Sequence, residues 1–459
     1  MTGDQQRVEE RIGEWRSFLL RRQAIASADV DELEGHLRDQ IDGLEASGLS
    51  SDEAFLVAVS RMGRLDELSR EFAREHSDRL WKQLVAGDDD RAAERNRGLA
   101  LAVGLACAAA LAVKVPALFG ITFGGDPGFY GLNLALLILP FLAAYFLVRR
   151  RSRPGTILAV AVPFAAAALV LDLYPFQPDG ATIMLAAMHA VVALWIVTGI
   201  AYVDGAWRSD RARMDFIRFT GEWFIYLVLM ALGGGVLAAL TIGVFGAIGL
   251  EAEWFISEWL IPCGLAGAVV LAGWLVEAKQ SVIENIAPVL TKLFTPLFTL
   301  LLLALIVAAA VQGGMAAGDS SIVVFGERDL LIIFDVILVV VLGLLLYSLS
   351  ARAPEQAPGW FDRLQLVMLV AALVIDILVL VGMISRIAEF GASPNKLASL
   401  GLNVILLANL VGAAWLQLRF LMQATPFSSV ERWQTAYVPV YLAWATIVVV
   451  VFPPVFGYA

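Results

Sequence analysis

The order of apolar and polar residues divides the chain into two parts. Residues 1–97 mix charged and apolar positions, whereas the rest consists of long apolar runs separated by turn residues and charges. An apolar run of about twenty residues crosses the roughly 30 Å hydrocarbon core of a membrane as a helix. We therefore predict about eleven membrane-spanning helices. They lie near residues 98–120, 129–149, 155–175, 181–203, 222–249, 254–276, 289–312, 329–350, 364–386, 398–419 and 434–456.

The first part shows a different periodicity. Apolar residues recur there every three or four positions, which is the spacing of one face of a helix. Such stripes lie near residues 12–19, 30–44, 55–62 and 65–72. Asp29 and Ser50 stand where helix N-caps are expected, and Gly48 stands where a helix ends. The pattern predicts a small bundle of three or four helices over residues 1–87, then a charged linker over residues 88–97 and a multipass domain over 98–456.

Composition agrees with a membrane protein that carries a charged head. Of the 459 residues, 59% are hydrophobic, the mean hydropathy is +0.75 and the net charge is −10. The first 97 residues hold 37 of the 76 charged side chains, and 22 of these 37 are acidic. An acidic head does not neutralise phosphates, so we expect no nucleic-acid partner. The acidic start of the chain does not fit a signal peptide, which favours a cytoplasmic head.

Basic residues are distributed unevenly between the two sides of the predicted topology. With the head in the cytoplasm, the loops on its side hold 14 Lys and Arg residues, and the opposite loops hold 3. Basic loops stay on the cytoplasmic side of a membrane. We therefore expect an inner-membrane protein with a cytoplasmic N-terminus and an outside C-terminus. Ten or twelve spans would place the C-terminus inside, and the count depends on the glycine-rich segment 222–249.

Two stretches of the chain resemble known families. Residues 31–73 read DELEGHLRDQIDGLEASGLSSDEAFLVAVSRMGRLDELSREFA, and their ELxxHL…GLSxxEA…MG pattern resembles the helical permease prefix domain. This resemblance covers about residues 8–78 and implies attachment to a permease-like or signalling membrane region. Some members precede exporter permeases with a large extracytoplasmic domain after the first span, and the outside loops here are too short to hold one. Residues 276–305, VEAKQSVIENIAPVLTKLFTPLFTLLLLAL, resemble the multipass family called domain of unknown function 4153.

Several polar side chains fall inside the predicted spans, where a central charge costs about 2.5 to 3.5 kcal/mol on insertion scales. These candidate site residues are Lys114, Asp172, His189, Asp335, Asp376, Asn403 and Asn409, with Glu258 nearer an interface. In the predicted topology they lie at mid-depth or in the outer half of the membrane. We therefore expect a polar cluster open to the outside. Lys114 is its only cation, and we expect Asp376 or Asp335 as its partner.

Two interpretations of this cluster stay open. The first is a proton- or ion-linked path in which Asp376 or His189 changes protonation. The second is a buried Lys–Asp pair, with hydrogen bonds between helices that fix the packing. The glycines of segment 222–249 likewise favour either close helix packing or a broken helix that lines a cavity.

The chain contains no familiar catalytic motif. It has no GxxxxGK[ST] phosphate loop, no HExxH and no GxSxG, and its three histidines are scattered. We therefore expect no enzyme activity, no cofactor and no metal site, and we interpret His36 and the acidic run 88–90 as solvated surface groups. The hypothesis is a lipid-embedded permease that moves, or helps to move, a small solute or ion. Residues 1–87 would then dock a cytoplasmic protein. The alternative is a signalling or stress-response component that transports nothing.

Overall fold

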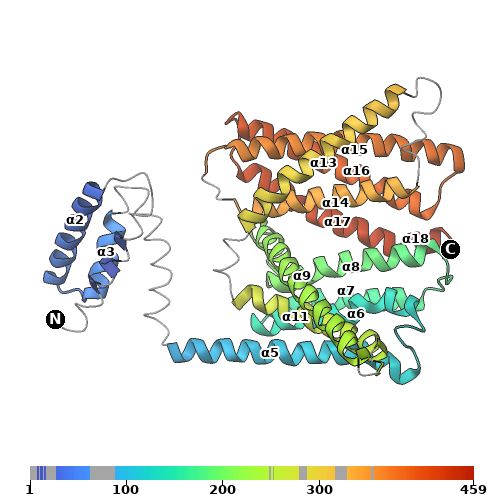
Figure 1. Ribbon diagram of the computed structural model, residues 1–459, viewed down its shortest axis with the longest axis horizontal. Coiled ribbons are helices and arrows are strands. Elements are labelled where there is room, and N and C mark those ends of the chain that lie inside the picture. Colours follow the sequence, from blue (N-terminus) through green and yellow to red (C-terminus); the bar gives the residue numbers. More distant parts are fainter. Residues whose placement is uncertain are drawn as a thin grey trace. The chain divides into compact units, whose positions relative to one another are not determined.

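The computed structural model describes residues 8–9, 11–13, 15–16, 27–62, 88–247, 250–251, 253–278, 287–315, 328–352 and 356–459. These residues form helices, turns and loops, and they contain no β-strand (Figure 1). The chain divides into two compact units, Met1–Arg97 and Gly98–Ala459. The predicted all-α architecture is thus confirmed for the described part of the chain.

In the described residues of the first unit, helices α2 (Ser27–Ala46) and α3 (Ser51–Met62) pack against each other. Trp15, Leu37 and Phe55 belong to their shared apolar core. The turn after α2 passes through Gly48, whose φ of +98° is a conformation that glycine adopts without strain. The predicted helical stripe at residues 65–72 lies outside the described residues.

The second unit contains the membrane-length helices. Eleven helices of the described part are long and apolar enough to cross a membrane, as predicted. They comprise α5 (Asp88–Lys114), α6 (Pro127–Arg149), α7 (Pro154–Leu173), α8 (Ala181–Tyr202), α9 (Asp210–Ala247), α11 (Ile261–Ala278), α13 (Ala287–Met315), α14 (Arg328–Ser350), α15 (Trp360–Phe390), α16 (Pro394–Leu421) and α17 (Ser428–Val450). Short elements extend three of them: η1 (Val115–Phe119) follows α5, α10 (Glu253–Phe255) and the π-helical turn η2 (Ile256–Leu260) precede α11, and α18 (Phe452–Val455) follows α17.

Three predicted boundaries differ from the structure. The charged segment 88–97, expected to be a linker, is helical and continuous with the first span. Helix α9 begins at Asp210, well before residue 222, and runs for 38 residues. Helix α17 ends at Val450, before residue 456. The predicted boundaries followed the apolar runs, whereas helical hydrogen bonding continues through polar residues wherever the backbone permits it.

Two apolar cores organise the second unit. The first includes Leu142, Phe146 and Phe219 and lies among α5, α6, α8, α9 and α11. The second includes Leu338 and Ile375 and lies among α14, α15 and α16. Helix α17 contacts both α8 and α16, so it joins the two groups of helices (Figure 1).

Neither prediction for the glycines of segment 222–249 holds in the described chain. Helix α9 passes through Gly233, Gly234 and Gly235 without a break. A Cβ atom at any of these glycines would meet no described atom within 4 Å. The shortest glycine contacts of the described part lie elsewhere, on α16. There a Cβ atom at Gly401 or Gly412 would meet a tryptophan ring of α17 at 2.0 Å.

Candidate functional site

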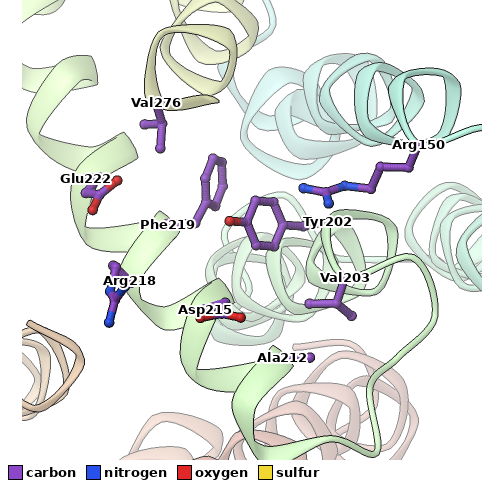
Figure 2. A pocket seen from close by; sticks show the side chains of 9 residues that line it. All are labelled: Arg150, Tyr202, Val203, Ala212, Asp215, Arg218, Phe219, Glu222 and Val276. Carbon is purple, nitrogen blue, oxygen red and sulfur yellow. The ribbon is translucent and has the colours of Figure 1, made fainter. Parts of the chain in front are cut away.

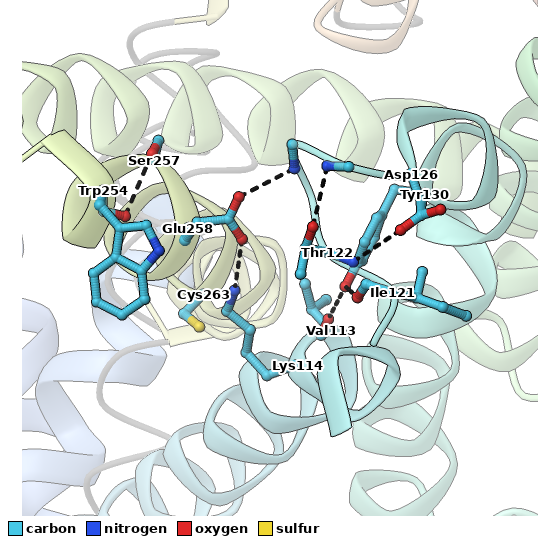
Figure 3. Close-up of polar contacts among 12 residues, drawn as sticks. Val113, Lys114, Ile121, Thr122, Asp126, Tyr130, Trp254, Ser257, Glu258 and Cys263 are labelled. Atoms are coloured by element: carbon cyan, nitrogen blue, oxygen red, sulfur yellow. Dashed lines mark hydrogen bonds and ion pairs between the residues drawn. The ribbon is translucent and has the colours of Figure 1, made fainter. Parts of the chain in front are cut away.

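Lys114, at the end of α5, forms an ion pair with Glu258 (Figure 3). The distance from Lys114 Nζ to Glu258 Oε2 is 3.5 Å, and the ammonium also lies 4.8 Å from the centre of the Trp259 ring. The prediction that Asp335 or Asp376 would be its partner is therefore wrong. Glu258 lies in the π-helical turn η2, whose extra residue changes the direction in which its side chains point. The pattern of apolar residues along the chain does not predict this π-helical turn.

The same carboxylate holds the loop between α5 and α6. Glu258 Oε1 accepts a hydrogen bond of 3.0 Å from the backbone N–H of Gly124. Tyr130 reinforces the loop, since its hydroxyl donates to the carbonyl oxygens of Val113 and Ile121 (Figure 3). The pair thus connects three segments of the chain. This geometry favours the packing interpretation for Lys114.

Asp172 and His189 join no polar cluster with the other predicted residues. Asp172 is exposed near the end of α7. His189 Nδ1 lies 2.8 Å from the carbonyl oxygen of Leu185, one turn earlier on α8. Within the described ranges, no hydrogen bond or ion pair connects either side chain to the remaining candidates.

Asp335 and Asn403, predicted to lie in one cluster, are in contact. The Asn403 Nδ2 group donates to Asp335 Oδ1 over 2.7 Å and to the backbone carbonyl of Ser399 over 2.9 Å. It also lies 3.8 Å from the sulfur of Met383. Helices α14, α15 and α16 each contribute to this contact, and Asn403 is fully buried. An acidic group and an amide therefore meet inside the second core.

Asn409 belongs to a second polar contact, formed between α16 and α17. Its Nδ2 group donates to Gln434 Oε1 over 3.1 Å and to the hydroxyl of Tyr441 over 2.5 Å. Its backbone carbonyl accepts a hydrogen bond from Trp433 Nε1 over 3.0 Å. Both Asn409 and Gln434 are fully buried. Two neighbouring helices are thus joined by side-chain amides at membrane depth.

A third polar group, which lies toward the start of α15, was not among the predicted site residues. Gln365 donates to Ser348 on α14, while Gln417 on α16 donates to Gln365 Oε1 and to the carbonyl oxygen of Asp362. The carboxylate of Asp362 pairs with Arg352, with Nε to Oδ1 at 3.0 Å. The predicted residues were ionisable groups and asparagines. A glutamine within an apolar run indicates a buried polar contact in the same way.

Asp376 lies between these groups. Contacts of Gln365 with Gln417, and of Met383 with Asn403, fix the antiparallel register of α15 and α16. That register brings Asp376 level with the turn of α16 that contains Asn409. Along α15, Asp376 stands about 21 Å beyond Asp362, at 1.5 Å per residue. It thus stands near the middle of α15, which is the part of a membrane-length helix that would cross the hydrocarbon core.

The Asp376 carboxyl is completely buried and isolated from donors. Its relative exposure is 0%, and neither oxygen has a hydrogen-bond partner among the residues that the structure describes. A buried carboxylate without a cation or donor is costly, so the site is suited to a group that holds a proton.

Unpaired polar atoms also occur on α16 and α17. Each belongs to a buried amide that already makes one of the contacts above. They are Asn403 Oδ1, Asn409 Oδ1, Gln417 Oε1 and Gln434 Nε2. Buried polar atoms in proteins are normally hydrogen-bonded, so these unpaired atoms mark places along α16 and α17 where water or an ion is favoured.

We define the Asp376 layer as the polar residues on α14–α17 that lie level with this carboxyl or on either side of it along these helices. It comprises Asp335, Gln365, Asp376, Asn403, Asn409, Gln417 and Gln434. The structure thus brings four of the seven predicted residues into one region and places Lys114, Asp172 and His189 elsewhere. No group of three metal-ligating side chains occurs in the described part of the chain. The layer can hold a proton or bind a small polar species through amide oxygens.

Comparisons with known proteins found no match among family models, curated proteins or solved structures. The resemblances to a permease prefix domain and to domain of unknown function 4153 therefore stay predictions.

Proposed function

We propose that this protein moves protons, or a small solute together with protons, across the bacterial inner membrane. Asp376 is the group that takes up and releases the proton. The observation that carries the proposal is the complete burial of this carboxyl without a hydrogen-bond partner. Ionisable groups at membrane depth are costly, and in membrane proteins they mark proton and ion pathways.

The neighbouring amides support a path on both sides of Asp376. Asn403 and Asp335 lie toward one end of α15, and Gln365 and Gln417 lie toward the other. Each amide can accept or donate a further hydrogen bond, and water held by such atoms can relay a proton. Side-chain amides thus extend the polar region from the middle of the membrane toward both surfaces.

The orientation of the path belongs to the same proposal. Basic residues gather in the loops that share a side with the head, which supports a cytoplasmic N-terminus and an outside C-terminus. In that orientation Asp335 and Asn403 face the outside, and Arg352 with Asp362 face the cytoplasm. The compact first unit would then dock a regulatory protein.

The test is proton flux in vesicles containing the purified protein. The outer solution is made more acidic than the vesicle interior, and a pH-sensitive dye inside the vesicles reports the resulting acidification. Valinomycin and potassium clamp the membrane potential. Asp376→Asn keeps the size of the side chain and removes its titration, so we expect flux to fall to the level of empty vesicles. Asp172→Asn is the matched control, because Asp172 is exposed and lies outside the Asp376 layer. Its flux should equal that of the unmodified protein.

Two outcomes contradict the proposal. One is equal flux in Asp376→Asn and in the unmodified protein. The other is an unmodified protein whose vesicles conduct no more protons than empty ones under any solute gradient tried. A protein of the second kind would fit the signalling alternative. In that case deletion of residues 1–87 should abolish partner binding, whereas a proton carrier should keep its flux after the same deletion.

A further inference from the structure

A polar pocket of about 410 Å³ opens where α6, α8, α9 and α11 come together, apart from the Asp376 layer (Figure 2). Four charged side chains line it: Arg150, Asp215, Arg218 and Glu222. Tyr202 and Phe219 provide aromatic walls, with ring centres 4.5 Å apart. Its volume is that of a small-molecule site.

Both arginines are held in fixed positions. Arg150 Nη2 lies 3.0 Å from a carboxylate oxygen of Glu277, and its guanidinium stacks over the Tyr202 ring at 4.6 Å. Arg218 Nε donates over 2.9 Å to the carbonyl oxygen of Ser350, at the end of α14. A guanidinium has five N–H donors, so each side chain keeps donors for a ligand. One of these is Arg150 Nε, which is buried and has no partner in the described part of the chain.

The acidic side chains occupy different depths of the pocket. Glu222 is 5% exposed and lies beside the buried residues Phe219 and Val276, whereas Asp215 is exposed at the mouth. In Figure 2 Arg150 reaches toward Tyr202 from the opposite side of the pocket to Glu222. A ligand with a negative and a positive group separated by a few atoms matches this arrangement. Arginine forks recognise phosphate, and a carboxylate beside aromatic faces recognises an ammonium group.

The surroundings of the pocket are basic and lie at the ends of membrane-length helices. Arg149, Arg151 and Arg153 follow one another at the end of α6, and Arg208 and Arg211 precede the pocket residues of α9. Basic pockets between helices at the cytoplasmic surface bind lipid headgroups. The positive-inside pattern places these loops on that surface. A phosphate ester is therefore favoured over a simple amino acid.

We propose that this pocket binds an ethanolamine phosphate group, with the phosphate on Arg150 and the ammonium on Glu222. The inference does not depend on proton movement through the Asp376 layer. The same chemistry occurs in the headgroup of phosphatidylethanolamine and in soluble phosphate esters. The acyl chains of the lipid would lie against the apolar outer faces of the neighbouring helices.

The experiment compares lipid binding to the purified full chain by native mass spectrometry. Phosphatidylethanolamine, phosphatidylcholine and phosphatidylglycerol with identical acyl chains are titrated separately. We expect phosphatidylethanolamine to bind most tightly. Arg150→Gln and Glu222→Gln should each weaken it by about tenfold or more, the effect of removing one charge-assisted hydrogen bond. Arg363→Gln is the matched control, because Arg363 is an exposed arginine on α15 and does not line the pocket.

Calorimetry with glycerophosphoethanolamine separates the two sources of the ligand. Affinity for this soluble ester close to that of the lipid identifies a free solute, and binding of the lipid alone identifies a headgroup site. Either result supports the proposed binding of an ethanolamine phosphate group, provided that Arg150→Gln weakens the binding. Equal binding of the three lipids, or unchanged binding in both Arg150→Gln and Glu222→Gln, overturns the proposal. Asp376→Asn should bind the lipid as the unmodified protein does. The lipid-binding test therefore remains valid even if the proposed proton transport is disproved.

Discussion

The Lys114 ammonium lies 3.5 Å from the Glu258 carboxylate, although the two residues are 144 positions apart in the chain. Their side chains are 9% and 17% exposed, so both charges are largely removed from water. Glu258 also accepts the backbone N–H of Gly124. The pair therefore connects the end of α5, the following loop and the turn before α11, and it explains how a lysine is tolerated in an apolar span.

Removing one partner of this pair should destabilise the protein. Lys114→Met leaves Glu258 partly buried without its cation, which we expect to cost up to about 3 kcal/mol. The double variant Lys114→Met with Glu258→Gln removes both charges and should recover part of that loss. Thermal unfolding of the purified protein in detergent measures the effect. A melting temperature of Lys114→Met equal to that of the unmodified protein would show that the pair contributes nothing to stability.

Close packing of α16 against α17 gives a second prediction. A Cβ atom at Gly412 would lie 2.0 Å from the Trp433 ring, which also donates to the carbonyl oxygen of Asn409. Gly412→Ala should therefore push α16 and α17 apart and cost about 1–3 kcal/mol. Gly243→Ala is the matched control, because a Cβ atom there meets no described atom within 4 Å. Since alanine favours helix more than glycine does, that variant should be neutral or slightly stabilising.

Thermal unfolding of the two glycine variants, side by side in one detergent, decides the question. The expected order of melting temperatures is Gly412→Ala lowest, then the unmodified protein, then Gly243→Ala. The reverse order for the two variants would mean that α17 is not seated on α16 in the way described.

The sequence predicts some of these features well and others poorly. The number of membrane-length helices follows from the length of the apolar runs, because hydrocarbon thickness sets that length directly. The partner of Lys114 does not follow, since it depends on a local π-helical turn that places Glu258. Likewise the contact of Asp335 with Asn403 requires the register of three helices. Hydropathy measures how apolar a segment is and carries no information on which face meets which neighbour.

The next prediction concerns the stability of the first unit at low pH. In the first unit Glu34 accepts hydrogen bonds from Arg38 and Arg16. The bond from Arg38 is the main cause that lowers the pKa of Glu34 below its ordinary value, against a smaller opposite effect of burial. A carboxyl whose pKa is lower in the folded state stabilises that state at neutral pH. This stabilisation should fade as the pH falls from the unfolded value, about 4.3, through the folded one.

Hydrogen exchange of peptides from α2, in the full-length protein, measures this effect. Protection should decrease between about pH 5 and pH 3 after correction for the intrinsic exchange rate. Glu34→Gln should show weaker protection at neutral pH and a smaller decrease on acidification. An identical decrease in that variant would assign the acid response to other carboxyl groups.

The last prediction concerns the stability cost of Asp376. Its carboxyl is fully buried without a hydrogen-bond partner in the described structure, so its burial opposes folding. Asp376→Asn and Asp376→Leu should therefore match or exceed the unmodified protein in melting temperature. Asp362 lies on the same helix and is also buried, but it pairs with Arg352 and accepts the backbone N–H of Gly359. Asp362→Asn removes that ion pair and should lower the melting temperature.

If Asp376→Asn raises the melting temperature and Asp362→Asn lowers it, the two variants distinguish a functional carboxyl group from a structural one on the same helix. Residues that act in a site are often retained at a cost in stability, whereas residues that hold the fold are not. A marked loss of stability in Asp376→Asn would mean that the carboxyl has a structural partner. Its role would then be the packing of α15, and the loss of proton flux in that variant would no longer identify a path.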